Sequence, residues 1–215
     1  MTADPSRENW NANCSVSTTG QQARECRRLR RSGRLSDLMP VFDLSMHTSG
    51  DRDWALLMNS HVHLYWRDQV LEETVNWLQG HGYHVLATNA GQWAEPADMH
   101  SDLARLLAFP SYYGRNLDAL NDCLRDVAAY GYGARQDSAG TVLVLTHFDA
   151  FARTRRNVAQ ALLDIFAGVA RRAMLVGHRM LCLVQSDDPA IEFGPVGASP
   201  VMWNPQEWLR AKRTP

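Results

Sequence analysis

The chain has 215 residues, of which 45% are hydrophobic and 21% charged, and its formal net charge at pH 7 is −1. These values are ordinary for a globular protein with a sizeable core. The sequence contains no apolar run of about 18 residues and no apolar signal-peptide core near its start, so we expect a cytoplasmic protein without a membrane partner. Residues 51–194 hold twelve arginines against seventeen acidic residues, which disfavours nucleic acid as a direct ligand.

The first 50 residues differ in composition from the rest of the chain. They are rich in Ser, Thr, Asn and Arg, and residues 24–31 form a basic run without a sustained apolar period. One interpretation is a basic arm that touches nucleic acid or a membrane. The interpretation that we favour is a disordered extension, or sequence upstream of a start at Met39 or Met46. We therefore expect residues 1–45 to be dispensable, so that a chain starting at Met46 keeps its melting temperature within a few degrees.

From residue 53 the sequence alternates between strand and helix patterns. Strands are predicted where apolar and β-branched residues form short runs, and helices where apolar residues recur every three or four positions. In chain order these are a strand at 61–66, a helix at 70–78, a strand at 83–88, helices at 99–107 and 116–130, a strand at 141–146, a helix at 158–170 and a strand at 180–184. This alternation predicts an α/β domain over residues 53–190, with a small parallel sheet of three or four strands flanked by helices.

Residues 191–215 are predicted to form a C-terminal tail. The run Asn204-Pro205-Gln206-Glu207 has the pattern of a helix start, with an N-cap residue, a proline in the first turn and a capping acid. We expect a short helix there, which carries Trp208 and docks with Trp203 on the domain.

The sequence shows no pattern typical of catalysis or of a metal site. His61 and His63 would share one face of a strand, but a third ligand is not apparent. The four cysteines, at positions 14, 26, 123 and 182, have no metal-ligand spacing. There is no glycine-rich phosphate loop, nucleophile elbow or HExxH run. We therefore expect no metal, no cofactor and no enzymatic activity.

The helix predicted over residues 116–130 has two different faces. Its apolar residues recur at helical spacing and predict a buried side, formed by Leu117, Leu120, Leu124 and Val127. Its acidic residues recur at every fourth position and form an acidic stripe of Asp118, Asp122 and Asp126. Like charges at this spacing destabilise a helix by roughly 0.2–0.5 kcal/mol per pair. The stripe is either a solvated face, neutralised in part by Arg115 and Arg125, or the binding surface for a cationic partner.

The stretch Tyr112–Asp122 reads Tyr-Tyr-Gly-Arg-Asn-Leu-Asp-Ala-Leu-Asn-Asp and resembles the barstar family, the intracellular protein inhibitors of microbial ribonucleases. Nine of its eleven positions agree with the family pattern, and Arg115 and Asn121 occupy variable positions. The resemblance covers about residues 81–188. It implies a three-stranded parallel sheet with four helices for that part of the chain.

The resemblance also implies which residues bind the partner. Asp118, Asp122 and Asp126 would imitate successive phosphates of RNA and fill the cationic cleft of a nuclease. Tyr112 and Gly114 would face the nuclease, and Asn116, which suits an N-cap, would complete the surface. One of the two tyrosines, Tyr112 or Tyr113, is expected to pack inward, and the pattern leaves open which one.

Three positions depart from the family pattern. Asn121 replaces a tryptophan, Val127 replaces an aromatic contact residue, and Gly168 stands where the family supplies an acidic contact from a later helix. These substitutions leave Asp118 and Asp122 as the retained acidic contacts.

Together these observations predict a non-enzymatic, barstar-like inhibitor of a secreted or toxin-type ribonuclease, acting as an immunity protein or antitoxin. The alternative is a barstar-fold adaptor that binds a protein other than a nuclease. A third, less favoured interpretation is a nucleic-acid-associated protein that acts through its basic residues 24–31.

Overall fold

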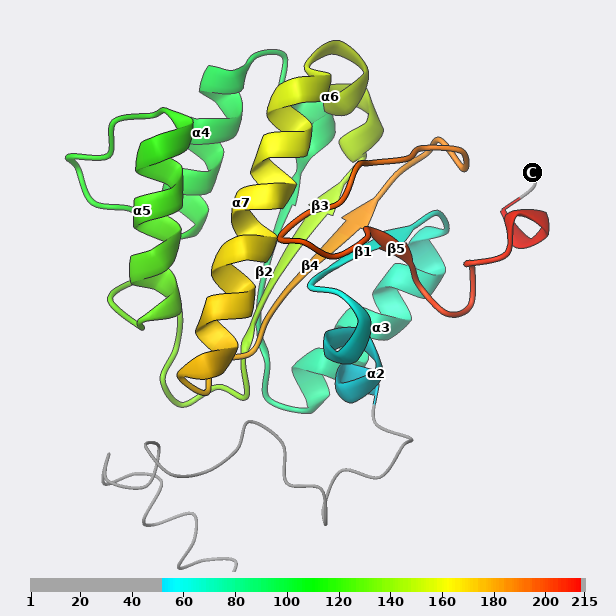
Figure 1. Ribbon diagram of the computed structural model, residues 1–215, viewed down its shortest axis with the longest axis horizontal. Coiled ribbons are helices and arrows are strands. Elements are labelled where there is room, and N and C mark those ends of the chain that lie inside the picture. Colours follow the sequence, from blue (N-terminus) through cyan, green and yellow to red (C-terminus); the bar gives the residue numbers. More distant parts are fainter. Residues whose placement is uncertain (1–51, 214–215) are drawn as a thin grey trace, which may run out of the picture. The chain divides into compact units, whose positions relative to one another are not determined.

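A computed structural model describes residues 52–213, so the predicted extension of residues 1–50 lies outside the described residues. The elements appear in Figure 1. In chain order they are α2 (Arg52–Asn59), β1 (Val62–Tyr65), α3 (Asp68–Gly80), β2 (His84–Asn89), the 3-10 helix η1 (Ala90–Gln92), α4 (Pro96–Leu106), α5 (Leu117–Ala128), β3 (Thr141–Thr146), α6 (Phe148–Thr154), α7 (Arg156–Leu175), β4 (Met180–Gln185), β5 (Met202–Trp203) and the 3-10 helix η2 (Arg210–Lys212). Within this part of the chain no helix is both long and apolar enough to cross a membrane.

The five strands form one parallel sheet in the order β2-β3-β4-β1-β5. The predicted α/β class is therefore confirmed, but the sheet has one strand more than the three or four expected. β1, predicted over residues 61–66, pairs with β4. The additional strand is β5, whose two residues pair with β1. A segment this short carries no periodic pattern of its own, so only its pairing with β1 identifies it as a strand.

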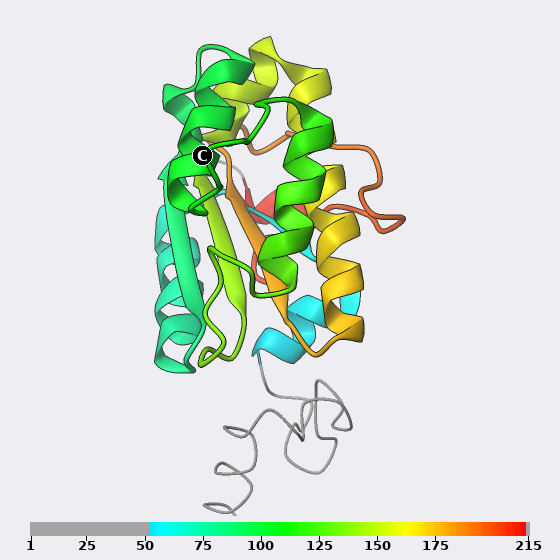
Figure 2. The ribbon, with the colours of Figure 1, turned by 90° about the vertical axis from the view of Figure 1, so that its left-hand side faces the viewer.

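Helices cover both faces of the sheet, as the two views in Figures 1 and 2 show. Side chains alternate between the two faces of a strand. In β3, Val142 and Val144 pack in a cluster with residues of α2 and α3. Leu143 and Leu145 pack in the larger cluster, which contains residues of α4, α5, α6 and α7. Because both faces are covered, β3 and β4 read as nearly continuous apolar runs, which is typical of parallel sheets.

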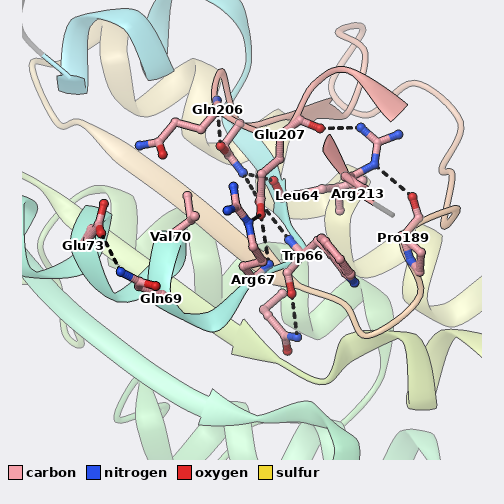
Figure 3. Close-up of polar contacts among 12 residues, drawn as sticks. Leu64, Trp66, Arg67, Gln69, Val70, Glu73, Pro189, Gln206, Glu207 and Arg213 are labelled. Atoms are coloured by element: carbon pink, nitrogen blue, oxygen red, sulfur yellow. Dashed lines mark hydrogen bonds and ion pairs between the residues drawn. The ribbon is translucent and has the colours of Figure 1, made fainter. Parts of the chain in front are cut away.

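The C-terminal segment differs from the prediction. Residues 205–207 form a turn instead of an α-helix, and up to residue 213, where the description ends, the only helical element that follows is η2. Trp208 is 62% exposed instead of docking with Trp203. The cause lies in Glu207, whose carboxylate accepts hydrogen bonds from the backbone N–H groups of Trp66 and Arg67 at 3.0 and 3.1 Å. The acid that was expected to cap its own helix therefore caps the start of α3 instead, as Figure 3 shows.

A second contact holds the end of this segment on the domain. The guanidinium of Arg213 lies 4.1 Å from the ring centroid of Trp203 and donates hydrogen bonds to the carbonyl oxygens of Pro189 and Glu207. Trp203 therefore packs against Arg213 and not against Trp208. The docking residue of the tail is a cation, whose stacking on an aromatic ring is favourable when it is partly shielded from water.

His63 lies in β1 and His61 directly precedes it, and both side chains are buried. His63 is 2% exposed, and its Nε2–H donates to the carbonyl oxygens of Leu56 and Ser60 at 3.0 and 3.1 Å. Burial lowers the pKa of His63 to about 4, and the pKa of His61 is lowered too, mainly by burial. Among the described residues there is no group of three or more His, Cys, Asp or Glu side chains that could hold a metal ion.

We expect mild acid to destabilise the protein through His63. An unfolded histidine titrates near pH 6.5, so between pH 6.5 and 4 the unfolded state binds a proton that the folded state excludes. Lowering the pH from 7 to 5 should therefore reduce the free energy of unfolding by about 2 kcal/mol through this group. Urea unfolding at the two pH values measures the loss. In His63→Gln the difference between the two pH values should shrink, whatever the absolute stability of that variant; an unchanged difference would assign the pH dependence to other groups.

Candidate functional site

The loop that precedes α5 places its two tyrosines differently. Tyr112 is 77% exposed. Tyr113 packs inward, its ring centroid 4.9 Å from that of Phe109 and its hydroxyl donating to Nδ1 of His100 at 2.5 Å. Burial raises the pKa of Tyr113, and burial together with the charge of Arg115 lowers the pKa of His100. The neutral His100 can thus accept the Tyr113 hydrogen bond, which anchors the loop and leaves Tyr112 facing solvent.

The start of α5 is formed by Asn116 and the two residues before it. The side-chain oxygen of Asn116 accepts a hydrogen bond from the Ala119 N–H at 2.8 Å, as an N-cap does. Arg115 adopts a positive φ of 50°. Gly114 is not one of the described glycines with a positive φ. A Cβ at this position would lie 3.3 Å from Asn116 Nδ2. The glycine is therefore explained by close packing against the cap, and Asn116 has a structural role in addition to its exposure.

The three aspartates of the acidic stripe are all exposed on α5. The opposite side of the helix is buried and contains Leu120, Leu124 and Val127. Successive aspartates are one turn apart, which corresponds to about 6 Å along the helix axis. The carboxylate of Asp122 lies 3.8 Å from Arg125, and both side chains are largely in water, at 73% and 61% exposure. Such an ion pair contributes little to stability and can open when a partner binds.

The two outer aspartates differ in their contacts. Asp126 accepts a hydrogen bond from the Tyr132 hydroxyl at 3.1 Å, which ties the loop after α5 to the helix. Asp118 lies in the first turn of α5, where the helix dipole favours a negative charge. The predicted partner-binding residues are therefore all exposed, on α5 or in the loop that leads into it. We call them the α5 face: Tyr112, Gly114, Asn116, Asp118, Asp122 and Asp126.

The three departures from the family pattern have different structural consequences. Val127 is fully buried in the core, so this position supplies no surface contact. Asn121 is half-buried and accepts a hydrogen bond from Arg172 of α7 at 3.5 Å. Gly168 lies in α7, and a Cβ built there meets no atom within 4 Å. α7 packs directly beside α5 (Figure 2), so both Gly168 and Arg172 belong to a helix that borders the α5 face.

Gly168 offers a simple test of the helix beside the α5 face. Gly168→Ala should raise the free energy of unfolding by about 0.5–1 kcal/mol, because alanine restricts the unfolded chain and finds free space here. The matched control is Gly197→Ala. Gly197 has a φ of +54°, and its Cβ would lie 2.8 Å from a backbone atom of Ala167, so this variant should be destabilised. Equal effects of the two changes in chemical denaturation would contradict the assigned geometry.

Two structural features of the site were not predicted from the sequence. One is the hydrogen bond between His100 and Tyr113, and the other is the approach of Arg172 to Asn121. His100 follows Met99 on the inward side of α4 and lies three residues before Leu103, and this apolar spacing is the signal by which its burial could have been found. No local pattern in the sequence indicates the Arg172 contact, which joins residues 51 positions apart.

A second polar cluster lies at the carboxyl ends of β3 and β4. His147 Nδ1 lies 2.8 Å from Asp187 Oδ2, and this carboxylate raises the pKa of His147. The side chain of Gln185 accepts from the His147 N–H, and Asp149 accepts from the Asp187 N–H. These four side chains and backbone groups satisfy one another's hydrogen bonds and join the end of β3 to the end of β4. The cluster therefore has a structural role.

Comparison with known proteins shows what the chain is similar to. A family model described as Barstar (barnase inhibitor) matches residues 70–185, just over half of the chain. In Bacillus subtilis (strain 168), the protein named "Putative ribonuclease inhibitor YrdF" is 69% identical over 26 residues, which are 12% of this chain and 29% of that protein. The chain thus matches less than a third of the length of this relative. All residues of the α5 face lie inside the family match.

Proposed function

The chain belongs to the barstar family, and on this basis we propose that it inhibits a microbial ribonuclease by covering the cationic active site of that enzyme with the α5 face. The observation that carries the proposal is the combination of three solvent-facing aspartates on one side of α5 with the exposed Tyr112 at its start. The description of the family and the name of the Bacillus subtilis relative both support inhibition of a ribonuclease as the general role.

The spacing of the acidic stripe fits this proposal. Carboxylates about 6 Å apart along a helix can stand in for successive phosphates of RNA, and they can pair with the Arg, Lys and His side chains of a nuclease cleft. Pairs between arginine and carboxylate are often bidentate, which adds selectivity for geometry to the attraction between charges. Tyr112 adds apolar area and a hydroxyl, a combination that is enriched at protein interfaces.

The rigidity of the α5 face also supports the proposal. The Asn116 cap, the bond between Tyr113 and His100 and the packing of α5 on α7 hold the surface in place before a partner arrives. Binding then loses little conformational entropy, which favours tight association. In this proposal the protein binds the ribonuclease one-to-one in the cytoplasm and blocks its active site, without catalysis or a cofactor. It thereby protects its cell from a secreted or toxin-type ribonuclease.

Titration against a panel of microbial ribonucleases that includes barnase tests the proposal. We expect one-to-one binding and loss of RNA cleavage for at least one member of the panel. If no ribonuclease is inhibited at micromolar excess, the barstar-fold adaptor, which binds a different class of protein, takes its place. A salt-dependent affinity for RNA itself would instead favour nucleic-acid binding through the basic residues of the chain.

A further inference from the structure

Three arginines lie at the start of α5 and along one side of the acidic stripe. Arg115 lies between Gly114 and the N-cap of α5, Arg125 lies on α5 itself, and Arg172 lies on the neighbouring helix α7. All three are exposed. We call Arg115, Arg125 and Arg172 the arginine border. Three arginines beside three aspartates give this part of the surface a formal charge of zero.

The members of the arginine border are only weakly neutralised by the protein itself. Arg125 makes a long, solvent-exposed pair with Asp122 at 3.8 Å. Arg172 donates to the neutral side chain of Asn121, so its charge has no carboxylate partner in that contact. Arg115 is exposed, and none of the ion pairs between described residues includes it; its charge acts on His100, whose pKa it helps to lower. Arg115 and Arg172 therefore present positive charge that is available to a partner.

The arginine border lies beside the acidic stripe, and Arg125 touches it through its ion pair with Asp122. Residues of a helix are about 100° apart around its axis, so Asn121 and Arg125 lie on one flank of the stripe. Arg172 contacts Asn121, which identifies this flank as the side next to α7. The positive charges thus lie at the start of α5 and along its α7 side, and the negative charges lie along the remaining exposed side. A partner that covers the whole surface meets both signs.

This arrangement makes demands on the partner. A charge that is covered by an interface and left unpaired, or placed opposite a like charge, costs binding free energy, and proteins use such costs to reject wrong partners. A ribonuclease whose contact surface is positive throughout would meet Asp118 and Asp122 favourably, but it would bring its cations against Arg115 and Arg172. A ribonuclease with acidic groups beside its cationic cleft would pair its cations with the aspartates and its carboxylates with Arg115 and Arg172.

We propose that Arg115 and Arg172 determine which ribonuclease is bound, by selecting an enzyme that carries carboxylates next to its basic cleft and by rejecting one that is uniformly cationic. This inference rests on the proposed function and specifies the partner of the same surface. Arg172 lies one helical turn after Gly168, so α7 presents a cation to the partner close to the position where the family pattern has an acid.

Charge reversal tests the inference. The double variant Arg115→Glu/Arg172→Glu is compared with wild type and with Arg210→Glu/Lys212→Glu, which makes the same change in net charge at exposed positions of the C-terminal segment. Two partners are used: the ribonuclease that wild type inhibits best in the panel, and a short polyarginine peptide as a uniformly cationic probe. We expect the first double variant to inhibit that ribonuclease at least about tenfold less well and to bind polyarginine at least about tenfold more tightly, whereas the control changes either affinity by less than about threefold.

The possible outcomes separate this inference from the proposed function. If wild type inhibits a ribonuclease and the double variant inhibits it equally well or better, the selecting role of the arginines is overturned and inhibition stands. If neither wild type nor the variant inhibits any ribonuclease, the proposed function and the selecting role of the arginines are both overturned. The variants Arg115→Asn and Arg172→Ala remove the charges without reversing them, and asparagine tolerates the positive φ of residue 115. They should produce smaller changes in the same directions, and thermal unfolding verifies that each variant is folded.

Discussion

Asp122→Ala is expected to weaken binding to the target ribonuclease by at least ~2 kcal/mol, mostly through faster dissociation. Asp122 is the middle residue of the acidic stripe, so a partner that covers the α5 face excludes water most completely around this carboxylate. Central, desolvated charges dominate the energetics of such interfaces, and removing one leaves its partner buried and unpaired. Association and dissociation rates, measured with the ribonuclease inhibited best by wild type, give the size and the origin of the loss.

Two further variants serve as controls for Asp122→Ala. Asp126→Ala should cost under about 1 kcal/mol of binding free energy, since Asp126 lies nearer the rim of the surface and is partly engaged with Tyr132. Asp137→Ala makes the same change away from α5, where the carboxylate is exposed beside Arg135, and should leave binding unchanged.

Folding should be insensitive to the loss of Asp122. Its ion pair with Arg125 is solvent-exposed and weak, and its removal relieves repulsion from Asp118 and Asp126. Thermal unfolding of the variant should therefore match that of wild type. Full inhibition by a folded Asp122→Ala variant would move the binding surface away from α5.

The second large effect is expected for Glu207→Ala, which should lower the free energy of unfolding by about 3 kcal/mol. Glu207 is fully buried and accepts from the N–H groups of Trp66 and Arg67, from the Arg67 guanidinium at 2.9 Å and from Asn204 at 2.5 Å. Alanine leaves these donors without their acceptor, and it disconnects the C-terminal segment from the start of α3. Urea unfolding of the full chain measures the loss.

The matched control for this prediction is Glu72→Ala, at an exposed position of α3, which should change stability by less than about 0.5 kcal/mol. Glu207→Gln should fall between the two, because its amide keeps one acceptor but points a donor at other donors. A loss in Glu207→Ala no larger than that in Glu72→Ala would show that the C-terminal segment does not stabilise the domain.

The contribution of Glu207 should also depend on pH. Burial alone would raise the pKa of Glu207, but the hydrogen bonds from Trp66, Arg67 and Asn204 together hold it below its ordinary value. A lowered folded-state pKa means that the stabilisation is complete above the unfolded pKa, near 4.3, and is lost as the pH falls through the folded value. This acid window lies below that of His63, so the two losses can be measured separately.

The sequence by itself determined the features that depend on neighbouring residues. The apolar run at 141–146 predicts β3 with the bounds that the structure has, since a central parallel strand is buried on both faces. The spacing of leucines and aspartates predicts the two faces of α5, because both patterns repeat with the period of a helix. The N-cap role of Asn116 is also predicted locally, because asparagine is favoured directly before the first residue of a helix.

Only the tertiary structure decided the features that depend on residues far apart in the chain. The sequence favours a helix at Asn204–Glu207, but Glu207 meets unpaired N–H groups 140 and 141 positions earlier, and that interaction prevails over the local signal. The orientation of the tyrosines depends on whether His100 lies within reach of Tyr113, and the fifth strand depends on its pairing with β1. The charge pattern of the α5 face is likewise completed by Arg172 from α7. Local patterns specify helices and strands because their periods are set by the backbone, whereas the partners of buried polar groups and exposed charges are set by how those elements pack.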